Sequence, residues 1–580
     1  MRARHAALGI ALALLLSPGR ASHAATGPWG GSGTIVPPAH ADGLPPKTRA
    51  AIEAAEAAAR AGRPAKSTLA LRPAFAQYAW PLERALNDLV VAVNYTDLDP
   101  GPGRLDYMGG THNYDGHTGH DYTLTDFRDM DRGVRILAAA SGTVTYLDDT
   151  SPYDRHCTFD WPDGGNWVWI AHGDGTFHEY LHMRRSSMTV KLGDVVQPGQ
   201  MLGLVGSSGY STAPHLHFES GDYSGPGGGY AFREPSHGSA NPLPSLWNAQ
   251  EGYAGDEAFH VTGLGVYTDA QVGGSVFNTG YCDVVNSIPQ PLALGTNEDH
   301  LDMWIQFQSR AGDTAAVVVR KPDGAVYGSF DFVSQEPVQF GWFWAYYFFS
   351  PWVGPADHGT WRLQVQRGGT LVADRPFTVA GATTFAPRFW PRGGRSFRID
   401  GTVQRDTLRR LPYGPPVTYS LLGAPSFVSL VQDSIVQVAA TSSQPTRSAW
   451  FQVVMSDAAA RRDTAFYHVV DMSKPLDPLA GAPDARPASG LSLSAGAQPG
   501  AGPVPLRYQL PAAGRISLAV FDANGRRVCT LLDEPRPAGS GSLRWDGRDR
   551  SGRAAVPGVY FARLTSGSTS VTTRVVRLAP

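Results

Sequence analysis

The stretch His-Leu-His-Phe-Glu at residues 215–219 constrains the fold of this chain more than any other. Side chains two positions apart in a β-strand point to the same face, so the imidazoles of His215 and His217 project together. Leu216 and Phe218 face the other way, as expected of a half-buried strand. A His-x-His pair alone is weak evidence for a metal site, because a zinc site needs at least one further ligand from elsewhere in the chain.

A second group of metal-binding residue types lies upstream, in His-Thr-Gly-His-Asp at residues 117–121. His117 and Asp121 are four positions apart, an even spacing that shares one face of a strand, and Gly119 disfavours a helix. Together with one histidine of the 215–219 stretch they supply two imidazoles and one carboxylate. Such a three-ligand set leaves zinc a fourth position for water, which is typical of catalytic rather than structural sites.

These two motifs resemble those of the M23 family of zinc endopeptidases (lysostaphin/LytM type), where H-x-G-x-D and H-L-H both occur. The resemblance covers about residues 107–222. It implies that zinc is bound by three side chains and that two further histidines are catalytic. The implied metal ligands are His117, Asp121 and His217, and the implied catalytic residues are His182 and His215.

His182 lies in the stretch His-Glu-Tyr-Leu-His-Met at residues 178–183, which is similar to the family's Tyr-x-His-Leu element, with Met in place of Leu. Its alternation predicts a strand in which His178, Tyr180 and His182 share a face. The turn signal Asp174-Gly175 predicts a hairpin with a strand over residues 167–172. Three more histidines are interpreted as wall, surface or structural residues: His112, His120 and His172.

The implied chemistry is hydrolysis of a peptide bond by a zinc-activated water, with the two catalytic histidines moving protons. The Gly-Asp-x-Val-x-x-Gly-Gln stretch at residues 193–200 also occurs in biotinyl and lipoyl carrier domains. Such carriers need a modifiable lysine, and residues 192–217 contain none, so the carrier interpretation fails.

Length and composition predict a mainly β, multidomain chain. The 580 residues correspond to about four domains of ordinary size, and 66 glycines with 45 prolines indicate many turns and linkers. The net charge of −2 gives no indication of a nucleic-acid partner. The expected fold is an M23-type antiparallel β-sheet domain followed by immunoglobulin-like β-sandwich domains.

The N-terminal region is predicted to carry an export signal. Residues 1–24 combine basic residues, a short apolar run and a small-residue cleavage site, and they are interpreted as a signal peptide. No later segment is a better candidate for a membrane span, so the mature chain is expected to be periplasmic, cell-surface or secreted, without a transmembrane segment. Residues 25–76 read as a low-complexity segment with a helix over 47–61, acting either as a spacer or as a pro-segment.

The remaining organisation follows from strand patterns and linkers. We expect a peptidase domain over 77–250, a β-sandwich over 255–380, an immunoglobulin- or cadherin-like domain over 390–474, a linker over 475–502 and a last domain over 503–580. The last domain resembles the FlgD-type immunoglobulin-like domain through LRYQLP (506–511), ISLAVFD (516–522), LRWDGRD (543–549) and GVYF (558–561). The resemblance implies a spacer or sorting role, with an envelope or sorting partner.

The aromatic residues and the cysteines each leave two interpretations open. The aromatic residues within 340–352 could form core strands and domain contacts, or they could bind sugars or a partner. Three cysteines are too few for a disulfide scaffold, and a Cys157–Cys282 bridge cannot be inferred from spacing.

The sequence thus predicts an exported zinc metalloendopeptidase that cleaves peptide bonds in peptidoglycan stems or cross-bridges, with Zn²⁺ as cofactor and peptidoglycan peptides as substrate. A competing interpretation is a catalytically inactive LytM-like regulator of amidases. Such regulators typically lose ligands, and the retention of all the motif residues favours an enzyme. A zinc protease of non-wall proteins would share the same motifs, and a surface adhesin would act through the aromatic residues instead.

Overall fold

The structure is a computed structural model, which describes residues 29–35, 78–83, 90–157, 165–224, 230–251, 253, 259–268, 290–310, 312–334, 338–349, 353–390, 392–411, 414–477, 492–495, 504–510, 514–522, 526–536, 539–550, 553–556, 558–567 and 569–577. Within this part, helical structure is confined to α2 (Phe127–Asp131) and the 3-10 turn η4 (Pro355–Asp357). The predicted mainly β fold class is confirmed. None of the described helices is long and apolar enough to cross a membrane.

The predicted signal peptide (1–24) and the predicted helix over 47–61 lie outside the described residues. The chain divides into two compact units. One contains described residues 29–35, 259–268 and those within 290–384, and the second contains the remaining described residues.

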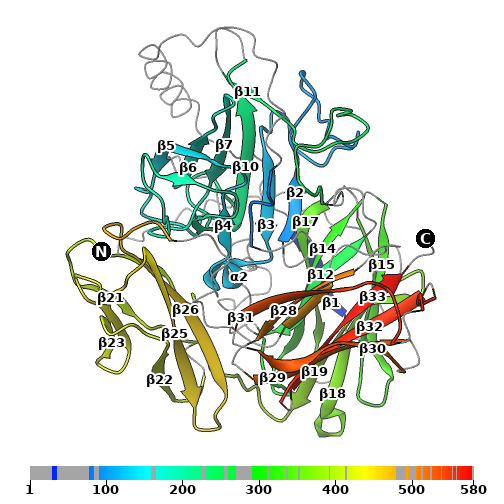
Figure 1. The fold of residues 1–580 in the computed structure, drawn as a ribbon. Coiled ribbons are helices and arrows are strands. Elements are labelled where there is room, and N and C mark those ends of the chain that lie inside the picture. Colours follow the sequence, from blue (N-terminus) through cyan, green and yellow to red (C-terminus); the bar gives the residue numbers. More distant parts are fainter. Residues whose placement is uncertain are drawn as a thin grey trace, which may run out of the picture. The chain divides into compact units, whose positions relative to one another are not determined.

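An antiparallel sheet of eight strands forms the region that carries the H-x-G-x-D and H-L-H motifs (Figure 1). Its strands follow the order β2 (Val90–Asn94), β3 (His120–Leu124), β10 (His215–Asp222), β7 (Thr176–Leu181), β6 (Trp167–Ala171), β5 (Gly142–Asp148) and β8 (Val195–Val196), with β11 (Ala231–Phe232) paired to β10. A separate two-stranded ribbon joins β4 (Arg135–Leu137) to β9 (Met201–Leu204). The strands β3 and β7 are buried along their whole length.

The hairpin between β6 and β7 forms as the Asp174-Gly175 signal predicts. Gly175 has a φ of +87°, which favours glycine, and the Asp174 side chain accepts a hydrogen bond from the Thr176 N–H at 3.0 Å. One face of this hairpin is aromatic, and Trp169 stacks on Phe177 with ring centroids 4.1 Å apart. The β-branched and aromatic residues of β6 thus pack as expected for a buried strand.

The opposite face of β7 carries a buried histidine among aromatic rings. His178 is fully buried, with its ring centroid 4.2 Å from that of Tyr78, 4.4 Å from that of His172 and 5.0 Å from that of Phe218. Neither ring nitrogen has a hydrogen-bond partner among the described residues. Burial lowers the pKa of His178 well below its ordinary value, and the charge of His172 lowers it further.

The buried His178 should make the sheet sensitive to acid. The unfolded chain takes up a proton near pH 6.5, whereas the folded chain does so only at lower pH, so the stability contributed by the neutral ring is lost as pH falls below about 6.5. The free energy of unfolding is expected to fall by up to about 1.4 kcal/mol for each pH unit below this value.

His178→Phe keeps an aromatic ring but cannot bind a proton. It is therefore expected to remove the part of the pH dependence of stability that comes from protonation of His178. Hydrogen exchange of peptides from β6 and β7 at pH 7.5 and 5.5, corrected for intrinsic exchange rates, measures the local opening free energy. An acid dependence identical in the variant and the wild-type protein would contradict this account.

The unit that contains residues 290–384 is a sandwich of two sheets. One sheet has the order β1 (Trp29–Ile35), β17 (Val338–Phe348), β14 (His300–Ser309) and β12 (His260–Tyr267). The second has the order β13 (Leu294–Gly295), β19 (Thr370–Ala380), β18 (Gly359–Arg367), β15 (Thr314–Arg320) and β16 (Val326–Val333). Apolar side chains of both sheets form one core, as in aligned β-sandwiches.

Two findings in this sandwich bear on sequence predictions. Residues 29–35, assigned to the low-complexity segment, form β1 and pair antiparallel with β17, although their Gly-rich sequence lacks strand alternation. Among the aromatic residues within 340–352, Tyr347 and Phe349 are fully buried in the core. The core interpretation therefore holds for these two rings.

Residues 396–470 contribute two further sheets around a second apolar core. One has the order β20 (Ser396–Arg398), β26 (Arg462–Val470), β25 (Ser448–Asp457) and β22 (Val417–Leu422), and the second β21 (Gln404–Thr407), β24 (Ile435–Val438) and β23 (Val428–Val431). The pair β20–β26 is parallel, and the remaining strand pairs of these two sheets are antiparallel.

The C-terminal region forms a third core between two sheets. Their orders are β27 (Ser492–Ala495), β28 (Val504–Leu510), β31 (Gly539–Trp545) and, in the second sheet, β30 (Arg527–Arg536), β29 (Gly514–Asp522), β32 (Gly558–Ser566), β33 (Thr569–Arg577). Strand β27 falls within the predicted linker 475–502, and it pairs with β28. Part of the predicted linker therefore belongs to this sheet.

The cysteines differ in state. Cys157 is disulfide-bonded and Cys529 is free. The Cys157–Cys282 pair that the sequence left open involves Cys282, which lies outside the described residues.

Candidate metal centre

Three side chains from adjacent strands form one row across the eight-stranded sheet. Asp121 on β3 lies directly opposite Asn94 on β2 and opposite His217 on β10. Directly opposite residues of antiparallel strands share a face, so the three side chains point to the same side of the sheet. His215 is two positions before His217 on β10 and shares that face, as the H-L-H alternation predicts.

His117 joins this row from outside the sheet. Strand β3 begins at His120, and His117 lies in the turn that precedes it. The prediction that His117 and Asp121 share a strand face is therefore wrong in its geometry, because the strand is shorter than the motif. The residues nevertheless meet: His117 Nε2 lies 3.2 Å from Asp121 Oδ1.

Gly119 permits this close approach. A Cβ atom at this position would lie 2.5 Å from the carbonyl oxygen of Phe218, 2.9 Å from Cγ of Glu219 and 3.0 Å from Nε2 of His217. Any side chain would push the turn away from β10. The glycine of the H-x-G-x-D motif is thus required by packing against the strand that carries His217.

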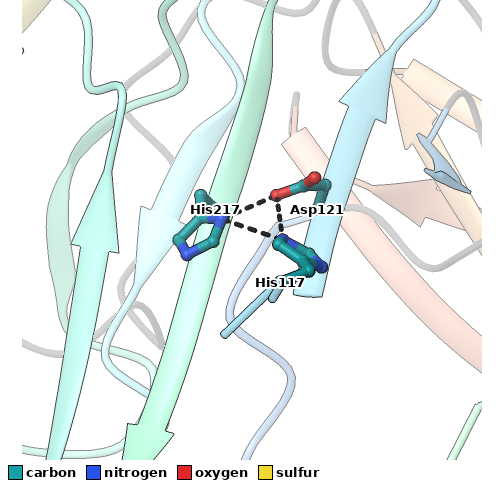
Figure 2. Close-up of side chains that lie close together, drawn as sticks. All are labelled: His117, Asp121 and His217. Atoms are coloured by element: carbon teal, nitrogen blue, oxygen red, sulfur yellow. Dashed lines mark hydrogen bonds and ion pairs between the residues drawn. The ribbon is translucent and has the colours of Figure 1, made fainter. Parts of the chain in front are cut away.

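Figure 2 shows the three side chains His117, Asp121 and His217 converging. His217 Nδ1 lies 2.8 Å from Asp121 Oδ1 and 3.2 Å from His117 Nε2. One ligand atom from each residue lies within 4.8 Å of the ligand atoms of its two neighbours, and all three residues are buried.

The opposite atom of each residue is held by a protein group. His117 Nδ1 donates to the carbonyl oxygen of Tyr95 at 2.7 Å, and the Asn94 amide donates to Asp121 Oδ2 at 2.8 Å. His217 Nε2 donates to Glu219 Oε1 at 3.0 Å. Because carbonyl and carboxylate oxygens only accept, these bonds place protons on the outer nitrogens and turn His117 Nε2, His217 Nδ1 and Asp121 Oδ1 inward.

The electrostatics of the group favour a bound cation. Burial alone would raise the pKa of Asp121, but the charge of His117 and the hydrogen bonds of His117 and His217 lower it well below its usual range. Burial disfavours the charged form of His217, yet its hydrogen bonds with Asp121 and Glu219 raise its pKa to about 10. The carboxylates of Asp121 and Glu219 therefore favour positive charge beside His217.

The donor set fits zinc. Two imidazole nitrogens and one carboxylate oxygen are the ligands of a three-residue catalytic zinc site. Ligand atoms bound to zinc at about 2.0–2.2 Å and near-tetrahedral angles lie about 3.3–3.6 Å apart. The observed separations of 2.8–3.2 Å are slightly shorter, so a small outward movement would accommodate the ion.

Two further histidines lie beside the cluster. His215 Nδ1 donates to the carbonyl of Ala213 at 2.8 Å, and its Nε2 lies 3.8 Å from Asp121 Oδ1. His182 Nδ1 donates to the carbonyl of Ser208 at 2.8 Å, and the His182 ring centroid lies 4.5 Å from that of His215. His182 Nε2 is buried without a hydrogen-bond partner among the described residues.

Burial is the main cause that lowers the pKa of both histidines. For His182 the charges of His215 and His217 lower it further, and the pKa falls well below the ordinary value. For His215 the charge of Asp121 opposes the effect of burial. Both rings are therefore neutral at neutral pH, with Nε2 able to accept a proton.

His182 reaches the cluster through a change of backbone direction that alternation could not predict. Strand β7 ends at Leu181, and His182 has a φ of +59°, in the left-handed region that is uncommon for residues other than glycine. The expectation that His178, Tyr180 and His182 share a strand face is therefore wrong for His182, whereas His178 and Tyr180 both lie on β7, two positions apart. The ring of His178 packs among aromatic residues.

The remaining candidate histidines lie outside the cluster. His120 faces the opposite side of β3, where Nδ1 bonds to the Tyr122 hydroxyl at 2.9 Å and Nε2 to Glu234 Oε2 at 2.8 Å. His172 Nδ1 donates to the carbonyl of Ser141 at 2.7 Å.

Sequence reasoning missed the residues that hold the outer atoms of the cluster. Glu219 could have been predicted from the sequence, because it is two positions after His217 and shares the same face of β10. No local sequence pattern marks Asn94 or the carbonyl of Tyr95 as partners of the cluster, since their role depends on the pairing of β2 with β3.

Comparison with known proteins identifies two domains. Residues 116–226 match the family model described as peptidase family M23, and residues 492–570 match the FlgD Ig-like domain. Both resemblances predicted from motifs are confirmed.

Curated relatives match short segments of the chain. Lysostaphin from Staphylococcus staphylolyticus is 50% identical over 56 residues, which cover 10% of this chain and 12% of lysostaphin. The peptidoglycan DD-endopeptidase ShyC from Vibrio cholerae is 35% identical over 103 residues, which cover 18% of this chain and 19% of ShyC. The matched segments therefore span less than a fifth of these relatives' length.

Among solved structures, the catalytic domain of the prophage-encoded M23 protein EnpA from Enterococcus faecalis is 30% identical. The match covers 25% of this chain and 91% of that domain, with a TM-score of 0.18.

Proposed function

We propose that this chain is an exported zinc metalloendopeptidase that hydrolyses peptide bonds in peptidoglycan stems or cross-bridges. The observation that carries the proposal is the convergence of His117 Nε2, Asp121 Oδ1 and His217 Nδ1, with their outer atoms held by the protein. The M23 match over residues 116–226 and relatives named as peptidoglycan endopeptidases support the substrate class.

In this proposal His117, Asp121 and His217 bind zinc, and His182 and His215 are catalytic. Zinc, when bound, would lower the pKa of its water toward about 7 and polarise the scissile carbonyl. His182 Nδ1 donates its proton in a hydrogen bond to the Ser208 carbonyl, so Nε2 is the nitrogen that can accept a proton. His215 is oriented in the same way by the Ala213 carbonyl. Two such acceptors side by side can take a proton from the attacking water and deliver one to the departing amine.

The rest of the chain would position this chemistry. We propose peptidase, sandwich, immunoglobulin- or cadherin-like and FlgD-type domains over 77–250, 255–380, 390–474 and 503–580. The signal peptide at 1–24 would direct export, and the FlgD-type domain would contact an envelope or sorting partner. An inactive regulator of amidases is less well supported, because the cluster retains two imidazoles and a carboxylate.

Digestion of purified sacculi by zinc-loaded protein, with mass spectrometry of the released fragments, tests the proposed activity and identifies the bond. Release of muropeptides cut at one type of peptide bond is expected. If a folded, zinc-bound protein releases nothing from sacculi yet cleaves a protein substrate, the substrate class is wrong. If it cleaves neither, the proposed peptidase activity is wrong.

His182→Ala should separate catalysis from metal binding. His182 contacts the carbonyl of Ser208 and the ring of His215, and it is not one of the three converging ligands. Loss of one general acid–base group lowers kcat by about 10²–10⁴-fold. Zinc affinity is expected to stay within about threefold of the wild-type value, because the ligand set is intact. Equal loss of zinc affinity and activity would contradict the assigned role.

A further inference from the structure

Glu219 lies in the interior of the sheet, immediately beside the candidate metal ligands. It is two positions after His217 on β10 and is fully buried. Its Oε1 accepts a hydrogen bond from His217 Nε2 at 3.0 Å, and the hydroxyl of Thr118 donates to the same oxygen.

The hydrogen bond from His217 decides which nitrogen faces the cluster. A carboxylate oxygen only accepts, so Nε2 carries a proton and the ring is turned with Nδ1 toward Asp121 and His117, the position from which its lone pair could bind a metal. Without an acceptor at Nε2, the proton could move to Nδ1 or the ring could turn about its χ2 bond. Either change would remove one of the three ligand atoms. A carboxylate partner also makes an imidazole ligand more basic.

Thr118 connects this support to the H-x-G-x-D motif. Thr118 lies between His117 and Gly119, and its hydroxyl bonds Glu219 across to β10. The missing side chain of Gly119 leaves the space that Glu219 Cγ and His217 Nε2 approach. One short segment therefore supplies two candidate ligands and also fixes the residue that orients the third.

Burial of the Glu219 carboxylate costs free energy, which a role in orienting His217 would explain. A carboxylate buried in a sheet loses its hydration, and hydrogen bonds must compensate for that loss. Two of its compensating donors belong to the metal-binding motifs, namely the imidazole of His217 and the hydroxyl of Thr118.

We propose that Glu219 is a positioning residue that holds His217 with Nδ1 toward the metal, and that Thr118 holds Glu219 in place. The inference rests on the proposed metallopeptidase function and extends it to a residue outside the ligand set. Glu219 does not touch substrate in this account; it acts through His217.

The test compares Glu219→Leu, Thr118→Val and Glu179→Leu in the full chain. Glu179 is an apt control, because it is fully buried and lies directly opposite Glu219 on β7. The zinc dissociation constant is measured by competition with a chromophoric chelator, and the absorption spectrum of the Co²⁺-substituted protein reports the ligand geometry. Thermal unfolding of the metal-free proteins measures structural damage separately.

Glu219→Leu removes the acceptor at Nε2, and it is expected to weaken zinc binding by about 10–100-fold and to alter the Co²⁺ spectrum. Thr118→Val removes one hydrogen bond to Glu219 and is expected to weaken zinc binding by about two- to tenfold. Glu179→Leu is expected to leave zinc affinity within about twofold, even if it changes thermal stability by as much as Glu219→Leu does.

Wild-type zinc affinity in Glu219→Leu would overturn the inference while leaving the proposed function intact. Equal weakening in Glu219→Leu and Glu179→Leu would also overturn it, because burial rather than position would then be the cause. If Glu219→Leu fails to fold, unchanged affinity in Thr118→Val overturns the inference. A folded wild-type protein that binds no zinc would instead refute the proposed function.

Discussion

His217→Ala is expected to abolish peptide-bond hydrolysis and to remove tight zinc binding. His217 supplies one of the three converging ligand atoms, at 2.8 Å from Asp121 Oδ1 and 3.2 Å from His117 Nε2. A metal's stabilisation of the reacting groups is worth several kcal/mol, so the expected loss of kcat/KM is on the order of 10³-fold or more. The measurement is muropeptide release from sacculi together with zinc content after dialysis.

His178→Phe is the matched control for this variant. His178 is a fully buried histidine of the same sheet, and it packs among aromatic rings away from the cluster. It is expected to keep zinc and activity. Hydrolysis that persists in His217→Ala at the wild-type rate would refute the ligand assignment.

Gly119→Ala is expected to reduce zinc binding and activity nearly as much as His217→Ala does, although it removes no ligand. The added Cβ would lie 2.5 Å from the Phe218 carbonyl and 3.0 Å from His217 Nε2, so the turn or strand β10 must shift. Overpacking of this kind costs about 1–3 kcal/mol of stability. Because the shift separates the turn that carries His117 from His217, zinc affinity and activity should fall with it.

Gly173→Ala provides the comparison for Gly119→Ala. A Cβ at Gly173 meets nothing within 4 Å, so the change should alter stability by less than about 0.5 kcal/mol. Thermal unfolding, zinc affinity and sacculus digestion are measured for both variants. A Gly119→Ala protein with wild-type zinc affinity would show that the close approach is not needed.

Short-range patterns predicted much of the sheet. The alternation of His215 and His217 placed both side chains on one face, and Asp174-Gly175 correctly marked the β6–β7 hairpin. These features depend only on the two-residue period of strands and on turn chemistry, both of which are local.

The sequence could not predict features that depend on where strands end and which strands pair. His117 was expected on a strand but lies in the turn before β3, and the left-handed backbone of His182 turns its ring toward His215 after β7 has ended. Asn94 reaches Asp121 only because β2 pairs with β3 in one register. Such contacts link residues far apart in the chain, so no local spacing records them.

The central claim is that His117, Asp121 and His217 together bind one zinc ion. The most direct test is X-ray absorption at the zinc edge of the purified protein, combined with zinc titration of the wild type and of His117→Ala, Asp121→Ala and His217→Ala. We expect one tight site in the wild type, with nitrogen and oxygen ligands only, and loss of that site in each variant. A site with sulfur ligands, or tight binding that survives any of the three substitutions, would contradict the assignment.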